Sequence, residues 1–204
     1  MNAKGPVMMI RRILTSLNCD GMYGVALLAT CSVLLLPELG GDAARALLRY
    51  DRAGLAAGQL WRLLTAHLVH LGLEHAALNS LGLVLMWALF ARDYKPVQWV
   101  SIALASMAAI DAGLWLRDST VIWYVGSSGA LHGVMSAGTL AHLRRRDLDG
   151  WILAAFIIVK LTYEQTAGAL PFAEGEGVVV DAHLYGALGG LAVAAFLKSR
   201  PEPL

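Results

Sequence analysis

The chain has 204 residues, of which 57% are hydrophobic and 15% are charged, and its formal net charge is +1. A soluble domain carries about 25% charged and about 45–50% apolar residues, so this composition indicates an integral membrane protein surrounded by a lipid bilayer. The basic residues are scattered between apolar runs, which excludes a nucleic-acid-binding surface.

Six apolar runs follow one another along the chain, at about 22–36, 73–90, 97–116, 125–143, 151–170 and 182–197. A spanning helix needs roughly 20 mostly apolar residues, and local thinning of the bilayer accommodates the short first and last runs. The runs are too long and too continuously apolar for barrel strands. Basic residues precede the first run, as in a signal peptide, but further spans follow, so we expect an uncleaved first helix. We predict an all-α integral membrane fold with six transmembrane helices, forming a single domain over 1–204.

The positive-inside rule sets the orientation of these spans. With the N-terminus inside, the inner segments hold ten basic residues: Lys4, Arg11, Arg12, Arg92, Lys95, Arg144, Arg145, Arg146, Lys198 and Arg200. The outer segments hold five, namely Arg45, Arg49, Arg52, Arg62 and Arg117. Both termini are therefore expected in the cytoplasm, and the protein is expected to be a multi-pass one.

Polar residues converge at one depth in this topology. The second, fourth and sixth spans all run inward, and their first turns hold His75 and Asn79, then Ser128, then His183. A serine hydroxyl becomes a strong nucleophile when a base takes its proton, and histidine suits that task. The pattern indicates peptide-bond hydrolysis near the outer surface. We expect a Ser-His dyad without a third acidic residue, because Asp181 is too close in sequence to His183 to orient its ring.

Glycines surround both candidate groups, at Gly126, Gly129, Gly133, Gly186 and Gly190. Small residues four apart let two membrane helices approach closely, so packing is an alternative explanation of the same motifs. Spacing alone leaves both explanations open, and both can hold, since tight packing would bring the serine to the histidine.

Other polar residues have competing interpretations. His75 and Asn79 share a helix face and would donate hydrogen bonds to an oxyanion, or else form an interhelical contact. Lys160 and Glu164 would neutralise each other, or Glu164 and Gln165 would contact the substrate. His70 is expected to tie the outer loop to a helix end, and His142 to be exposed. Without an HExxH frame, we expect no metal and no cofactor.

Four motifs in chain order resemble the rhomboid intramembrane serine proteases: Leu60-Trp61-Arg62, His70 with His75-x-x-x-Asn79, Gly126-Ser127-Ser128-Gly129, and Ala182-His183-x-x-Gly186-x-x-x-Gly190. The resemblance covers about 60–197 and implies the six-helix rhomboid fold with a water-accessible cavity opening outward. It implies that Ser128 is the nucleophile and His183 the base. It also implies that His75, Asn79 and the serine's own N–H bind the oxyanion.

One departure from the pattern of the family indicates a particular subgroup. Many rhomboids have a tyrosine four residues after the serine, packing on the catalytic histidine, whereas this chain has His132. The run from Ser128 to Gly133 and the minimal six-span length are similar to the bacterial rhombosortase subgroup. That subgroup is associated with proteins that end in a Gly-Gly motif, a transmembrane helix and a basic tail.

The resemblance therefore implies a serine endopeptidase of the bacterial inner (cytoplasmic) membrane. Its expected partners are membrane-anchored protein substrates, with C-terminal Gly-Gly tails as the expected recognition signal. Three alternatives are a general rhomboid protease, a catalytically inactive rhomboid-like protein that binds membrane clients, and a transporter that relays protons. The transporter would need polar groups through the whole membrane depth, whereas those found here cluster at one level.

Overall fold

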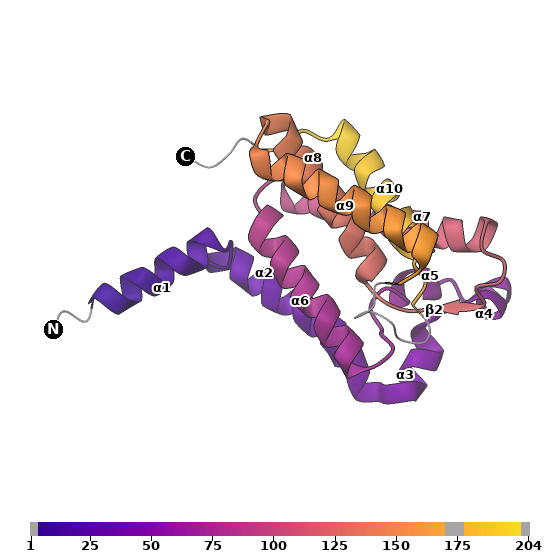
Figure 1. Ribbon diagram of the computed structural model, residues 1–204. Helices are drawn as coiled ribbons and strands as arrows, with labels where there is room; N and C mark the ends of the chain where they lie inside the picture. Colours follow the sequence, from indigo (N-terminus) through magenta and orange to yellow (C-terminus); the bar gives the residue numbers. More distant parts are fainter. Residues whose placement is uncertain (1–3, 170–177, 201–204) are drawn as a thin grey trace.

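The computed structural model describes residues 4–169 and 178–200, and most of them are helical (Figure 1). The elements of the first third of the chain are α1 (Lys4–Ser16), α2 (Gly21–Leu35), the 3-10 helix η1 (Leu36–Gly40), α3 (Gly41–Leu48), β1 (Tyr50–Asp51), α4 (Arg52–Ala56) and α5 (Arg62–Thr65). They are followed by α6 (Leu73–Phe90), α7 (Pro96–Leu116), β2 (Trp123–Tyr124), α8 (Ser128–Arg145), α9 (Leu148–Ala167) and α10 (Asp181–Phe196). The short strands β1 and β2 pair in antiparallel fashion, with Tyr50 opposite Tyr124.

Close contact between α8 and α10 forms the centre of the bundle, and glycines make it possible. A Cβ atom added at Gly129 would lie 2.7 Å from the Ala182 carbonyl oxygen, and one added at Gly133 would lie 2.6 Å from the Gly186 carbonyl oxygen. Any side chain would therefore push the two backbones apart. The small residues that suggested helix packing lie at this contact, so the sequence brings the first turns of α8 and α10 together.

The other helices enclose this central pair. Helix α7 packs against α8 and α10, α9 covers α8, and α6 lies between α8 and α2. Helix α1 projects away from the bundle (Figure 1). Separate apolar clusters fill the two ends: one includes Ile110, Leu114 and Ala182, and the other includes Tyr94 and Ile102. The bundle therefore holds the helix ends in fixed positions relative to one another.

Within the described residues, three helical segments are long and apolar enough to cross a membrane: Gly21–Leu48, Leu73–Phe90 and Pro96–Leu116. Three of the expected spans fall in these segments, so the structure does not establish the count of six. The other three expected spans form α8, α9 and α10. These three helices are shorter or more polar than the first three: α10 has only 16 residues, α8 ends in basic residues, and α9 carries Lys160 and Glu164. The expected end of the fifth span, residue 170, lies outside the described residues.

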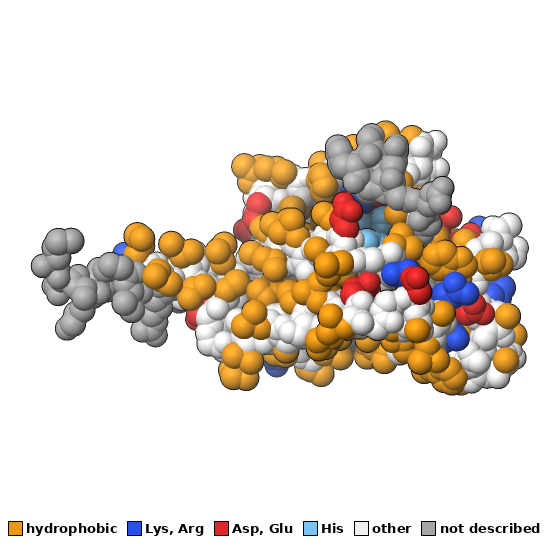
Figure 2. Space-filling view, turned by 90° about the horizontal axis from the view of Figure 1, so that it is seen from below, with side chains coloured by type: hydrophobic (Ala, Val, Ile, Leu, Met, Phe, Trp, Pro, Cys, Tyr) orange, Lys and Arg blue, Asp and Glu red, His pale blue; other side chains and the backbone are white. Residues whose placement is uncertain are grey.

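The outer surface of the bundle is strongly apolar. Large apolar side chains are exposed on several helices, among them Met22, Leu28, Leu81, Val97, Trp151 and Val159. Figure 2 shows such side chains over much of one face and along the projecting helix. In water this surface would be costly, whereas in lipid it is favourable. The chain is therefore a membrane protein with transmembrane helices.

Candidate active site

The first turns of α8 and α10 bring a serine and a histidine together. Ser128 is the first residue of α8, and His183 is the third residue of α10. The Ser128 Oγ atom lies 3.0 Å from the His183 Nε2 atom, although the residues are 55 positions apart. The His183 side chain is buried, whereas Ser128 is half-buried. This is the geometry that a hydroxyl needs in order to pass its proton to an imidazole.

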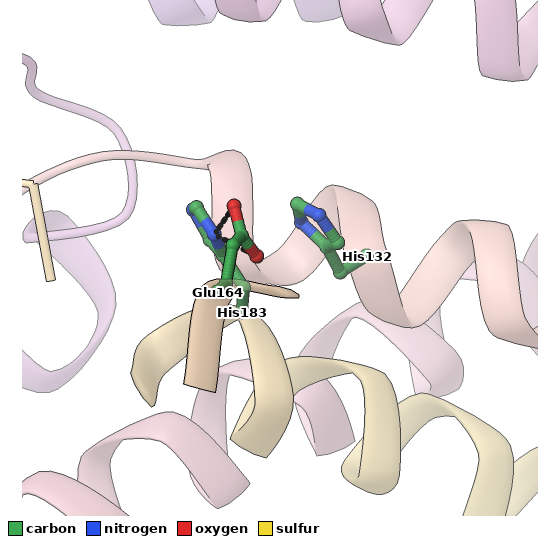
Figure 3. Close-up of side chains that lie close together, drawn as sticks. All are labelled: His132, Glu164 and His183. Carbon is green, nitrogen blue, oxygen red and sulfur yellow. Dashed lines mark hydrogen bonds and ion pairs between the residues drawn. The ribbon is translucent and has the colours of Figure 1, made fainter. Parts of the chain in front are cut away.

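The second nitrogen of the same histidine faces a carboxylate from α9. The His183 Nδ1 atom lies 3.0 Å from Oε2 and 3.1 Å from Oε1 of Glu164. Dashed lines mark this contact in Figure 3. Because an ionised carboxylate only accepts hydrogen bonds, this contact assigns the ring proton to Nδ1. The lone pair on Nε2 is then directed at the Ser128 hydroxyl. Lys160 Nζ, one turn earlier in α9, donates to Glu164 Oε1 at 2.6 Å.

His132 packs on the other side of this histidine. The two rings are stacked, with centroids 4.3 Å apart and planes inclined by 17°. His132 Nδ1 lies 2.8 Å from the Ser128 carbonyl oxygen, to which its N–H donates a hydrogen bond. The ligand-type atoms of His132, Glu164 and His183 lie within 4.8 Å of one another, so the group could hold a metal ion. Glu164 and His183 already bond to protein groups, however, and the expected absence of a metal stays a prediction.

A third helix brings hydrogen-bond donors to the serine. His75 Nδ1 accepts the Leu71 backbone N–H at 3.4 Å, which assigns the ring proton to Nε2. Gly126, at φ +122°, lies against this ring: a Cβ there would be 3.2 Å from His75 Cε1 and 3.9 Å from Ser128 Oγ. Asn79, one turn further along α6, is buried, and its Nδ2 has no hydrogen-bond partner among the described residues. The His75 ring therefore lies close to Ser128 across Gly126, and Asn79 adds an unused donor one turn further along the same helix.

His70 connects the loop before α6 to the start of α8. Its side chain is fully buried, and its Nε2 atom lies 3.1 Å from Ser127 Oγ. Arg45 Nε donates to the His70 carbonyl oxygen at 2.7 Å, and Glu38 accepts the His70 backbone N–H at 3.0 Å. Burial, with the charge of His75, lowers the pKa of His70 to about 4. A neutral His70 therefore holds the residue that precedes the nucleophile.

Sequence reasoning missed two contacts. It left two roles open for Glu164: neutralisation by Lys160 or, with Gln165, substrate contact. The Lys160–Glu164 pair is present, and both Glu164 oxygens have partners within the protein. Gln165 is exposed on α9, and its contact with substrate stays a prediction. The available signal was the carboxylate itself, because an ionisable group among apolar residues requires a partner. The expectation for His142 was wrong: the residue is buried, with Nε2 3.0 Å from Asp93 and Nδ1 2.7 Å from Asp149.

Comparison with known proteins identifies the family of this chain. Residues 57–200 match the family model of the rhomboid domain. The chain therefore belongs to the rhomboid family. It is similar to "Putative rhomboid protease YdcA" of Bacillus subtilis (strain 168), with 26% identity over 149 residues, which cover 73% of each chain. It is also similar to "Rhomboid protease GluP" of the same strain, with 29% identity over 144 residues, which cover 70% of this chain and 27% of that protein.

Proposed function

We propose that this protein is an intramembrane serine endopeptidase that cleaves membrane-anchored proteins near the outer face of the membrane. The observation that carries the proposal is the 3.0 Å contact between Ser128 Oγ and His183 Nε2, in a chain of the rhomboid family. A hydroxyl, a base with a fixed tautomer and unused donors beside them are the parts that acyl transfer requires.

The chemistry follows from these positions. Ser128 Oγ attacks the carbonyl carbon of the scissile peptide bond while its proton passes to His183 Nε2. Negative charge develops on the carbonyl oxygen, and the N–H groups of His75 Nε2, Asn79 Nδ2 and the serine backbone stabilise it. The protonated His183 then donates its proton to the leaving amine, which departs as the C–N bond breaks. A water molecule, activated by the same imidazole, releases the acyl group from Ser128.

The membrane arrangement is part of the proposal. The six long helices α2 and α6 to α10 would each cross the bilayer, as one domain over 1–204. The excess of basic residues in the segments assigned to the inside supports cytoplasmic termini and a site that opens outward. The two named relatives are bacterial, and the inner (cytoplasmic) membrane is the proposed location.

The substrate proposed is an exported protein that ends in a Gly-Gly segment followed by a transmembrane anchor. The rhombosortase-like run from Ser128 to Gly133, with His132 stacked on His183, supports this choice. Glycine adds no side chain to a narrow cleft and favours an unwound backbone. A reporter with such a tail should be cut faster at Gly-Gly than at an Ala-Leu junction. Equal processing would instead favour a general rhomboid protease.

The test of the activity itself is covalent labelling. A fluorophosphonate should label the wild-type protein at Ser128 and should not label Ser128→Ala, which is expected to insert normally into the membrane. Both Ser128→Ala and His183→Ala should fail to cleave the reporter, and the double variant should be as inactive as each single one, because the two residues act together. Labelling or cleavage that persists in Ser128→Ala would refute the assignment, and an inactive client-binding protein would show neither in the wild type.

A further inference from the structure

We propose that Glu164 is a positioning residue of the reaction, so that Ser128, His183 and Glu164 act together as a unit of three residues. This inference rests on the proposed protease function and extends it beyond the Ser-His pair. Glu164 would hold the His183 ring with its proton on Nδ1 and would stabilise the imidazolium that forms when Ser128 gives up its proton. The carboxylate itself stays ionised throughout, and no proton passes to it.

The geometry assigns the carboxylate to the histidine. Both Glu164 oxygens lie within 3.1 Å of His183 Nδ1, on the opposite side of the ring from Ser128. Glu164 is only 3% exposed, so its carboxylate is buried within the protein. Without this acceptor, the Nδ1 and Nε2 tautomers of His183 would compete, and the Nε2-protonated form cannot accept a proton from the serine.

The neighbouring lysine completes the charge balance. Lys160 Nζ bonds to Glu164 Oε1 at 2.6 Å, so the buried carboxylate is paired before the reaction begins. When the tetrahedral intermediate forms, the oxyanion and the imidazolium add one negative and one positive charge. The charges of Lys160, Glu164, the imidazolium and the oxyanion then sum to zero, as those of Lys160 and Glu164 did before the reaction. A buried carboxylate without this lysine would leave an unpaired charge in a region of low dielectric constant.

Ring stacking restricts the remaining freedom of the base. His132 lies parallel to His183 and is held by its own bond to the Ser128 carbonyl oxygen. Figure 3 shows Glu164 at the edge of the His183 ring, joined to it by dashed lines, with His132 beside the ring. The carboxylate fixes rotation within the ring plane, whereas the stacked ring fixes the plane itself. The two contacts therefore act on different degrees of freedom of the same imidazole.

The experiment compares Glu164→Gln and Glu164→Asp with the wild-type protein in membranes, using one reporter substrate and the fluorophosphonate. Glu164→Gln is expected to lower kcat by about 10²–10⁴-fold, the range that general acid–base catalysis supplies, with KM changed less than about 3-fold. The labelling rate should fall in parallel, because it measures serine activation without peptide binding. Glu164→Asp should recover part of the rate, since a carboxylate remains.

Two further variants separate positioning from folding. Glu164→Gln leaves Lys160 unpaired, so the double variant Lys160→Met/Glu164→Gln removes both charges and should fold while its kcat and labelling stay low. Glu74→Gln is the matched control, because Glu74 is exposed on α6 and makes no side-chain hydrogen bond within the described residues. It should behave as the wild type does.

The outcomes are distinct. A raised KM with unchanged kcat and labelling would overturn the proposal and make Glu164 a substrate contact. Wild-type kcat in the folded double variant would also overturn it. If Ser128→Ala is inactive while Glu164→Gln is fully active, positioning fails and the protease assignment survives. If Ser128→Ala cleaves and labels, the proposed function fails first.

Discussion

A histidine–carboxylate cluster lies at each end of helix α8, and the two clusters differ in what the second nitrogen of the histidine contacts. Near its start, His183 contacts Glu164 through one nitrogen and Ser128 through the other. Near its end, both nitrogens of His142 contact carboxylates, those of Asp149 and Asp93. Two acceptors require two donors, so the His142 ring bears both protons and has no lone pair to offer.

This difference shows what a buried histidine needs in order to act as a base. Burial and a carboxylate are common to both clusters, and Arg145 further ties Asp93 into the second one at 2.8 Å. The second cluster is therefore an ion network that joins α8 to the start of α9 and to the loop between α6 and α7. A hydroxyl on the free imidazole nitrogen, together with unused donors nearby, distinguishes the first cluster.

The largest expected effect separates the two histidines. His183→Ala should lower kcat by about 10⁴–10⁶-fold, the range for removal of a catalytic base, with little change in stability. His142→Ala should keep the rate constant of the folded protein and lower the free energy of unfolding by about 1–3 kcal/mol, because the buried Asp93 carboxylate loses one hydrogen-bond partner and keeps Arg145. Reporter cleavage and reversible unfolding in micelles measure the two quantities. Comparable kcat losses in both variants would contradict the assignment of His183 as the base and of His142 as a structural residue.

The second effect concerns the unused donors. Asn79→Ala should lower kcat by about 10²–10³-fold, since the amide acts on the developing oxyanion. The matched control is Thr139→Val on α8, because its buried hydroxyl also has no hydrogen-bond partner among the described residues. That variant should cleave at the wild-type rate. If Asn79→Ala also cleaves at the wild-type rate, the amide is a packing group.

The third effect tests how the helix contact positions the site. A Cβ added at Gly186 would collide with the backbone of Gly129, next to Ser128. Gly186→Ala should cost about 1–3 kcal/mol of stability and should lower kcat by about 10²-fold through displacement of the reacting groups. Gly82→Ala on α6 is the control, because its added Cβ would meet only Leu131 Cδ1, at 3.4 Å. A normal kcat in Gly186→Ala would show that the site tolerates wider helix separation.

The sequence predicted the helices better than it predicted the contacts between them. Continuous apolar runs located α6 and α7 within a residue of their ends, because burial in lipid depends on composition alone. Helix α8 begins three residues later than the expected 125, since Gly126 has a positive φ that a helix cannot include.

The candidate site was only partly predictable for a related reason. Glycine motifs in the first turns of two helices suggested that Ser128 and His183 meet, because small residues permit close contact. No comparable local pattern links Glu164 to His183 or His142 to Asp93. Such pairs depend on which faces of three helices meet, and that is settled by tertiary packing.

The smallest effect is a pH dependence specific to the serine end of α8. The pKa of His70 is lowered to about 4, mainly by burial, whereas in the unfolded chain it is about 6.5. The unfolded state therefore binds more protons below pH 6.5, so stability is present above that value and is lost as pH falls toward 4. Between pH 7 and 5.5 the loss should be about 1.2 kcal/mol. His70→Gln, which can still bond to Ser127, should show a correspondingly flatter stability profile over this range when unfolding is measured in micelles. Parallel profiles for the two proteins would mean that another group controls the acid response.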